Sequence, residues 1–217
     1  MYILLSFWES ALLNGVIRMT CEYNGGLTRE QFLFYEIRTV ASLQLKGLNR
    51  EEIVEEIKRE NLFQFPTERM ISSIAGTCFK RMDALDSETL VYYLANAPAE
   101  VAKQINLYAM MKYNRIVWDF MTTVIGEKYR TQELEFSGKD LNIFFFDLQE
   151  QNDTVASWSE STINKIKQVL KRSLVECEYL DSVRATQLNL VFISPELEDE
   201  IRANNDLAAL PAFNCFR

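Results

Sequence analysis

Histidine is absent from this sequence of 217 residues. Its absence excludes Ser/His/Asp and Cys/His nucleophile systems, metal sites with histidine ligands and the commonest general base. The chain also lacks the phosphate-binding loops GxxxxGK[ST] and GxGxxG and any run of residues with metal-ligand spacing. We therefore expect a protein that is not an enzyme and that uses no cofactor, metal or small-molecule substrate.

Cysteine, glycine and proline are also scarce. The four cysteines (Cys21, Cys78, Cys177 and Cys215) are scattered without CxxC spacing, which favours reduced thiols in a cytoplasmic protein. With only seven glycines and four prolines, helix-forming residues dominate every long segment, so the sequence predicts a mainly α protein with little material for a sheet.

Long hydrophobic runs are missing as well. Residues 1–19 resemble an export signal, but they have no basic start, and Glu9 and Asn14 interrupt the apolar run. No other stretch approaches the roughly 20 apolar residues that a membrane span needs. We expect residues 1–19 to form a buried helix and the protein to have no contact with a membrane.

Residues 1–130 are predicted to form an N-terminal helical bundle. Thr28 is expected to cap a helix, with Gln31 at the capping-box position, that ends at Gly47 and turns Tyr35 inward. Asn49, three residues before Glu52, then caps a short helix. Ser87 begins another short helix, and a long central helix is predicted over residues 99–129.

A third helix of this bundle is predicted to begin after Thr67 and to run to Leu85. Its apolar stripe includes Ile71 and Cys78. Small polar and basic residues occupy the opposite face: Arg69, Ser73, Gly76 and Lys80. The pattern fits a helix-turn-helix-like unit that contacts DNA, but any three-helix bundle shows the same pattern, so it favours a helix that only packs and leaves DNA contact as the alternative.

Residues 131–217 are predicted to form a C-terminal winged-helix-like domain. Ser137 with Asp140 caps its first helix, residues 154–158 form a short segment, and a long helix occupies residues 159–178. Alternating apolar residues around 179–193 predict a small β-hairpin, which would be the wing. Ser194 opens a last acidic helix, and the apolar tail after it is expected to dock on the protein.

The helix at residues 159–178 has one dry face and one basic face. Ile163, Ile166, Leu170 and Leu174 share a stripe. Four cations and no acid lie between Ser161 and Val175; subtracting their charge from the net charge of −8 leaves −12 on the rest of the chain. Because the net charge is negative, any nucleic-acid binding must be confined to a basic patch, and this face is the main candidate.

The basic face has the side chains that recognition of double-stranded DNA requires. Hydroxyl and amide groups can bond to base edges, and lysine or arginine can neutralise phosphates. The residues predicted to contact DNA are Ser161, Thr162, Asn164, Lys165, Gln168, Lys171 and Arg172 in the long helix, Lys139 in the preceding helix and Arg184 in the wing. Two alternatives remain open, a solvated helix face and an adaptor surface that binds another protein.

Four segments make the chain similar to the BrxA family of the BREX bacteriophage-exclusion systems. They are REQFLFYEIRTVA (29–41), ENLFQFPTERM (60–70), INLYAMMKYNRIVWDF (105–120) and SWSESTINKIKQVLKR (157–172). The resemblance covers nearly the whole chain. It implies a small helical defence protein without catalytic activity, which binds double-stranded DNA beside other BREX proteins that include a methyltransferase, an ATPase and an alkaline-phosphatase-like protein.

Overall fold

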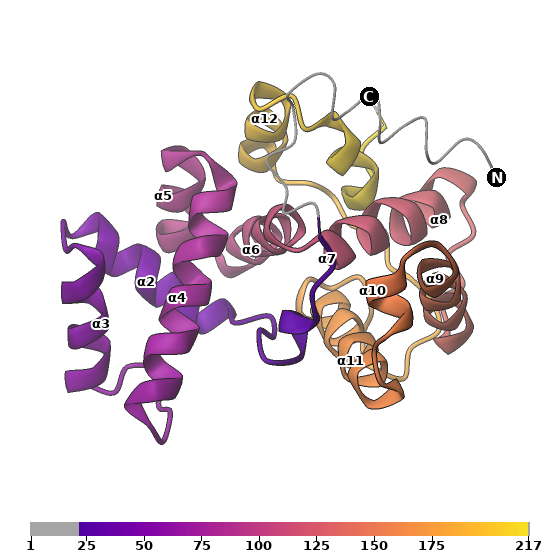
Figure 1. The fold of residues 1–217 in the computed structure, drawn as a ribbon. Helices are drawn as coiled ribbons and strands as arrows, with labels where there is room; N and C mark the ends of the chain where they lie inside the picture. The colour runs from indigo at the N-terminus through magenta and orange to yellow at the C-terminus, as the bar shows by residue number, and fades with distance from the viewer. Residues whose placement is uncertain (1–21, 217) are drawn as a thin grey trace.

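A computed structural model describes residues 22–216 of the protein, and this part of the chain folds into a series of helices (Figure 1). The expected helix at residues 1–19, and Cys21, lie outside the described residues. The elements in chain order are η1 (Gly25–Thr28), α2 (Phe34–Leu45), α3 (Arg50–Arg59), α4 (Glu68–Leu85), α5 (Glu88–Asn96), α6 (Ala99–Tyr113), α7 (Arg115–Asp119), the π-helical η2 (Phe120–Ile125), α8 (Gly126–Thr131), α9 (Gly138–Gln151), α10 (Asp153–Ala156), α11 (Glu160–Glu176), α12 (Pro195–Ala203) and η3 (Leu207–Phe213).

The helices from α6 to α8 run through the middle of the molecule. Figure 1 shows α2 to α5 on one side of them and α9 to α11 on the other, with α12 and the C-terminal segment above. The α6 helix packs against α4 and α5, whereas η3 packs against η2 and α8. One continuous hydrophobic core includes buried side chains from both predicted domains, and the boundary at residue 130 stays a prediction.

Most predicted helix starts are confirmed, because a polar side chain caps the first turn in each case. Asn49 accepts a hydrogen bond from the backbone of Glu52, and the Glu52 side chain accepts one from the backbone of Asn49. Thr67, Ser87, Ser137, Ser159 and Ser194 cap α4, α5, α9, α11 and α12. Local capping chemistry is thus a reliable guide to these helices.

The predicted start of the first long helix is wrong. The α2 helix begins at Phe34, not after Thr28, and Leu33 before it has a left-handed backbone with φ of 53°. The Arg81 guanidinium and the Asn106 amide both donate to the carbonyl oxygen of Phe32, which keeps this stretch out of a helix. As a result Tyr35, predicted to face inward, is 69% exposed.

The long helix predicted over residues 99–129 is divided at Asn114. This residue has an extended backbone, with φ of −129° and ψ of 114°, and its side chain accepts a hydrogen bond from the Ile116 backbone at 3.0 Å. The Asn114 side chain therefore caps α7 just after α6 has ended.

The prediction of a winged helix with a β-hairpin is wrong, whereas the prediction of a mainly helical chain is confirmed. Within residues 22–216 there is no strand, only one antiparallel bridge between Glu135 and Gln187. Around this bridge, Phe136 donates to the Thr186 carbonyl at 2.9 Å and Leu188 to the Leu134 carbonyl at 2.8 Å, and the pairing goes no further. Beyond it, helix side chains bond to the backbone of the segment: Tyr129 donates to the Asn189 carbonyl at 2.6 Å, and Gln104 to that of Phe192 at 2.8 Å. Residues 179–193 are therefore held by bonds to several elements rather than by a hairpin of their own.

The predicted docking of the C-terminal tail is confirmed. Leu210 and Phe213 of η3 are buried. Before them, the buried carboxylate of Asp206 accepts hydrogen bonds from the Tyr108 hydroxyl and the Lys112 ammonium group, both on α6. Apolar packing and this polar network together fix the tail to the central helix.

None of the helices in residues 22–216 has a stretch that is long and apolar enough to span a bilayer.

Candidate nucleic-acid interface

The basic face of α11 is open to solvent because the opposite face of the helix is buried. Ile163, Ile166, Leu170 and Leu174 all pack in the core, as the sequence predicts, together with Val169. Ser159 caps the helix by accepting from the backbone N–H of Thr162 at 3.2 Å. The core contact and the cap orient the polar side chains outward.

Seven residues of this face were predicted to contact DNA, and the structure divides them into two groups. Ser161, Asn164, Lys165, Gln168 and Arg172 are exposed, whereas Thr162 and Lys171 are half-buried. Thr162 lies under η1, since its Cγ2 methyl is 3.7 Å from the position that a Cβ on Gly25 would take. The described N-terminal segment thus covers part of the first turn of α11.

Three cations of the face have no acidic partner among the residues that the structure describes. Within residues 22–216, no ion pair or side-chain hydrogen bond engages Lys165, Lys171 or Arg172. Lys167 differs, because its ammonium group donates to Asn142 of α9 at 2.8 Å and lies over the ring of Phe145. Partial burial lowers the pKa of Lys167. Because both of its contacts are to α9, this lysine joins α11 to α9.

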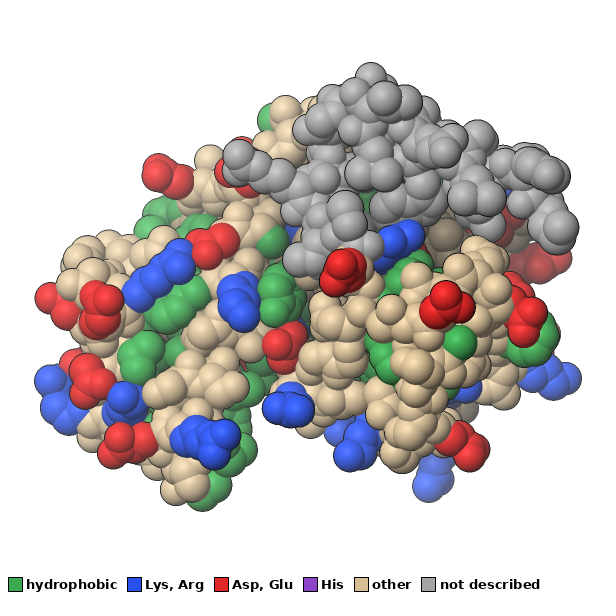
Figure 2. Space-filling model, viewed as in Figure 1, with side chains coloured by type: hydrophobic (Ala, Val, Ile, Leu, Met, Phe, Trp, Pro, Cys, Tyr) green, Lys and Arg blue, Asp and Glu red, His purple; other side chains and the backbone are tan. Residues whose placement is uncertain are grey.

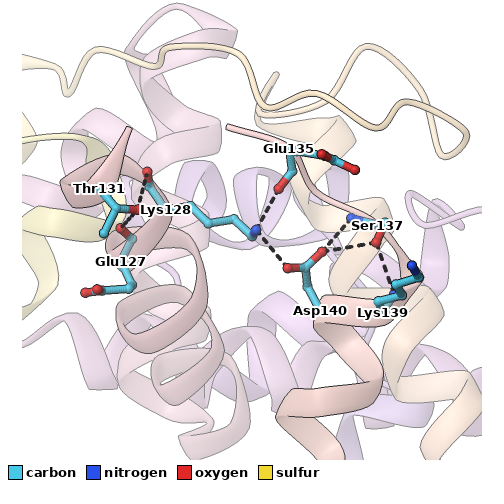
Figure 3. A network of polar contacts seen from close by, with 7 residues as sticks. All are labelled: Glu127, Lys128, Thr131, Glu135, Ser137, Lys139 and Asp140. Atoms are coloured by element: carbon cyan, nitrogen blue, oxygen red, sulfur yellow. Dashed lines mark hydrogen bonds and ion pairs between the residues drawn. The ribbon is translucent and has the colours of Figure 1, made fainter. Parts of the chain in front are cut away.

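Lys139 lies in the first turn of α9, where its backbone N–H donates to the Ser137 hydroxyl at 3.2 Å and so joins a polar network (Figure 3). In this network Lys128 pairs with Asp140 at 2.7 Å and donates to the Glu135 carbonyl at 2.6 Å. Partial burial opposes the charge of Asp140, but the bonds from Lys128 and Ser137 lower its pKa overall. The Lys139 side chain is exposed and takes no part in the network.

Arg184 is exposed in the turn at residues 181–184, where its backbone N–H donates to Ser182 at 3.3 Å. Within the described part of the chain it forms no hydrogen bond or ion pair with α11. The predicted wing, which would have carried Arg184 to the DNA, does not form in the described residues. Arg184 is placed only by the turn, and no described contact connects it to α11.

The second predicted contact surface lies on α4. Arg69, Ser73 and Lys80 are exposed on the outer face of this helix. Figure 2 shows Lys and Arg side chains along the lower edge of the molecule, on both sides of a hollow between the part with α4 and the part with α11. Basic side chains therefore face solvent on both sides of this hollow.

Arg81 of α4 was not singled out from the sequence, although this residue is important for the structure. Its side chain is buried and donates to three consecutive backbone carbonyls, those of Glu30, Gln31 and Phe32, at 2.8 to 2.9 Å. Burial lowers the pKa of this guanidinium. A signal existed in the sequence: Arg81 follows Cys78 by three residues and so belongs to the buried stripe rather than to the outer face.

A pocket of about 340 Å³ lies between the start of α2 and the outer face of α11. Its walls are residues 31–36 on one side and Val169, Arg172 and Glu176 on the other. Glu176 pairs with Lys103 of α6 at 3.1 Å and is therefore not available to Arg172. Arg172, the cation in the pocket wall, has no ion pair within the described residues. The sequence offered no sign of this pocket, because its two walls are more than a hundred residues apart along the chain.

Comparison with known proteins identifies the family. The BrxA family model matches residues 21–205. The chain belongs to the BrxA family. A BREX protein BrxA from Bacillus cereus (strain H3081.97) is 33% identical over 185 residues, which cover 85% of this chain and 92% of that protein. The resemblance inferred from four segments is thus confirmed, and the chain is a member of a family of the BREX phage-defence systems.

More distant relatives support the same assignment. The BREX protein BrxA of Escherichia coli O9:H4 (strain HS) is 25% identical, with 80% of this chain and 81% of that protein covered. A crystal structure of an uncharacterized protein from Magnetospirillum magneticum has the same fold, with a TM-score of 0.74 and 22% identity, and covers 88% of this chain and 97% of that chain. The helical architecture of this chain is therefore shared with a protein whose crystal structure is known.

Proposed function

We propose that this BrxA protein binds double-stranded DNA through the exposed basic face of α11, without catalysing a reaction, and that it acts beside other BREX proteins. The observation that supports the proposal is the set of three cations, Lys165, Lys171 and Arg172, without acidic partners in the described part of an acidic chain. A cytoplasmic location, where a duplex of phage DNA would be met, belongs to the same proposal.

Phosphate contacts supply the affinity in this proposal. A cation that already pairs with a carboxylate must give up that partner to bind a phosphate, whereas an unpaired cation only releases the counterions of the DNA. Lys139 at the start of α9 extends the same surface, because Lys167 and Asn142 join the two helices at 2.8 Å. These four cations can follow one DNA backbone.

Base contacts are assigned to the polar side chains of the same face. Asn164 and Gln168 are exposed and can bond bidentately to adenine. Ser161 can donate or accept, although its hydroxyl also bonds to that of Ser159 at 3.0 Å. Because η1 covers Thr162, we assign to this residue a smaller share of the contact than the sequence suggested.

We include in the proposal a second DNA contact through α4, which has less support than the contact through α11. Arg69, Ser73 and Lys80 are exposed on α4, and Figure 2 shows basic side chains on both sides of the hollow at the lower edge of the molecule. The three-helix arrangement of α2, α3 and α4 is compatible with a helix-turn-helix-like unit, since each of these helices contacts the other two.

The test is a titration of labelled duplex DNA at several salt concentrations around ~150 mM, near physiological ionic strength. Replacing Lys165, Lys171 and Arg172 by alanine should weaken binding and make the plot of log K against log [salt] shallower by about 2.7, since each phosphate contact contributes about 0.9. Replacing Lys46, Arg59 and Arg130, exposed cations on other surfaces, removes the same charge and should change the slope little. Equal losses in both triple variants would contradict the assignment of the site to α11.

A protein adaptor is the second candidate, and one observation favours it. The outer face of α9, next to α11, carries Ile143 and Phe146 with 61% and 62% of their surface exposed. Exposed apolar pairs of this size are common at protein interfaces. If the adaptor role is primary, I143S/F146S should abolish association with another BREX protein and leave DNA affinity unchanged, and the parent should not bind duplex DNA at micromolar concentration.

A further inference from the structure

We propose that the pocket between α2 and α11 holds one unpaired nucleotide of the bound DNA, with its base stacked on Tyr35 and its phosphate against Arg172. This inference rests on the proposed DNA binding by α11. It adds a preference for DNA that contains an extrahelical base, which a plain basic helix face does not provide.

The pocket wall on the α2 side is rigidly built. Arg81, fully enclosed by the protein, donates to the carbonyls of Gln31 and Phe32 at 2.8 and 2.9 Å, and Asn106 donates to the Phe32 carbonyl at 2.7 Å. Leu33 next to them has φ of 53°, a conformation that costs a bulky residue free energy. Strain that buried polar side chains enforce is typical of sites that bind something.

Tyr35 is the free aromatic surface of this pocket. Its side chain lines the pocket and is 69% exposed. Phe34 beside it is already engaged, because Lys103 and Arg38 lie over its ring at 5.6 and 5.8 Å. An exposed ring next to a DNA-binding surface is the platform on which unpaired bases stack in single-strand binding proteins.

The charged groups of the pocket match the two ends of a nucleotide. Arg172 belongs both to the pocket and to the proposed DNA surface, so it can contact the phosphate that joins a displaced base to the duplex. Glu36 on the opposite wall can accept hydrogen bonds from a ligand and has no ion pair within residues 22–216. A carboxylate favours a base with an exocyclic amino group, which adenine, cytosine and guanine have, over thymine.

The size of the cavity agrees with this occupant. Its volume of about 340 Å³ lies at the small end of the range of ligand pockets and accommodates one base with its sugar. Two stacked base pairs would not fit. The pocket therefore selects a single displaced nucleotide rather than the duplex itself.

The experiment compares a labelled duplex with the same duplex carrying one bulged adenine, at about 150 mM salt. The parent protein should bind the bulged duplex about tenfold more tightly, as expected for one stacked base. Tyr35→Ala should bring the two affinities within about twofold of each other and leave binding of the intact duplex unchanged, whereas Tyr35→Phe should keep the preference because phenylalanine also stacks. Tyr92→Ala, which removes a tyrosine that is 54% exposed on α5, is the matched control and should keep the preference too.

Each other result overturns the proposal in a recognisable way. Equal affinity of the parent for both duplexes removes the nucleotide pocket but leaves DNA binding by α11 intact. If the Tyr35→Ala variant still prefers the bulged duplex, the bulged base binds at another site and not in this pocket. Failure of both duplexes to bind overturns the proposed function and this inference with it. Tyr35-dependent binding of dAMP alone, without a preference for the bulge, would assign the pocket to a free nucleotide instead of DNA.

Discussion

Arg81 donates a hydrogen bond of 2.9 Å to the carbonyl oxygen of Phe32, 49 residues earlier in the chain. Through this bond a buried arginine on α4 sets the path of the backbone that leads into α2. The same backbone forms a wall of the pocket against α11. A residue without any contact to solvent therefore controls the junction between the α4 and α11 surfaces.

Replacing Arg81 with methionine should destabilise the protein by roughly 3 kcal/mol, because three backbone carbonyls lose a buried donor. Urea unfolding followed by circular dichroism measures the loss. Lys80→Met, a change of the exposed neighbour, should alter the free energy of unfolding by less than about 0.5 kcal/mol. Similar small effects of both changes would show that the carbonyls of residues 30–32 do not depend on Arg81.

Asp206→Leu should be strongly destabilising, by about 3 to 5 kcal/mol, since it leaves the buried Lys112 ammonium without a counter-charge. Adding Lys112→Met should recover part of this loss, because two apolar side chains can fill a site from which both charges have been removed. Chemical denaturation of the parent, both single variants and the double variant gives the coupling free energy. A double variant no more stable than Asp206→Leu would contradict the pairing.

The stability of the protein should depend on pH through Asp119. Burial raises the pKa of this carboxyl group to about 6, although the hydrogen bond from Tyr23 and the charge of Arg115 act in the opposite direction. The folded protein thus holds the proton more tightly than the unfolded chain, whose ordinary pKa is 3.8. The stabilising contribution is complete below pH 3.8 and is lost as the pH rises through 6.

The free energy of unfolding of the parent should therefore fall by roughly 2 kcal/mol relative to Asp119→Asn between about pH 4 and pH 7. Asparagine keeps an acceptor for the Tyr23 hydroxyl but cannot ionise in this range. Urea midpoints at a series of pH values test the difference. Parallel curves for the two proteins would mean that Asp119 titrates normally.

Lys165 and Lys167 should behave differently although only one residue separates them. Lys165→Ala removes an unpaired cation and should lower duplex affinity about fivefold at ~150 mM salt. Lys167→Ala breaks the bond to Asn142 and should cost about 1 kcal/mol of stability while changing DNA affinity less than about twofold. Fluorescence anisotropy and urea unfolding of both variants distinguish the two roles, and equal DNA effects would contradict them.

Sequence reasoning predicted the helices well where the signal was local. The caps at Asn49, Thr67 and Ser159, and the buried stripe of α11, follow from a few neighbouring residues and are confirmed. The wing was mispredicted because alternating apolar residues fit any extended segment. Whether such a segment becomes a strand depends on a continuous partner, and here the pairing with residues 134–136 stops at a single bridge, while Gln104 and Tyr129 bond to other carbonyls of the segment.

By itself the sequence determined the mainly helical fold, the basic amphipathic helix and the resemblance to the BrxA family, because periodicity, capping and residue types act over short distances. Only the tertiary structure decided which cations are unpaired, where α2 begins and that a pocket lies beside Arg172. These features depend on bonds between distant residues, such as that from Asn106 to Phe32 across 74 positions, and on burial that no local pattern encodes.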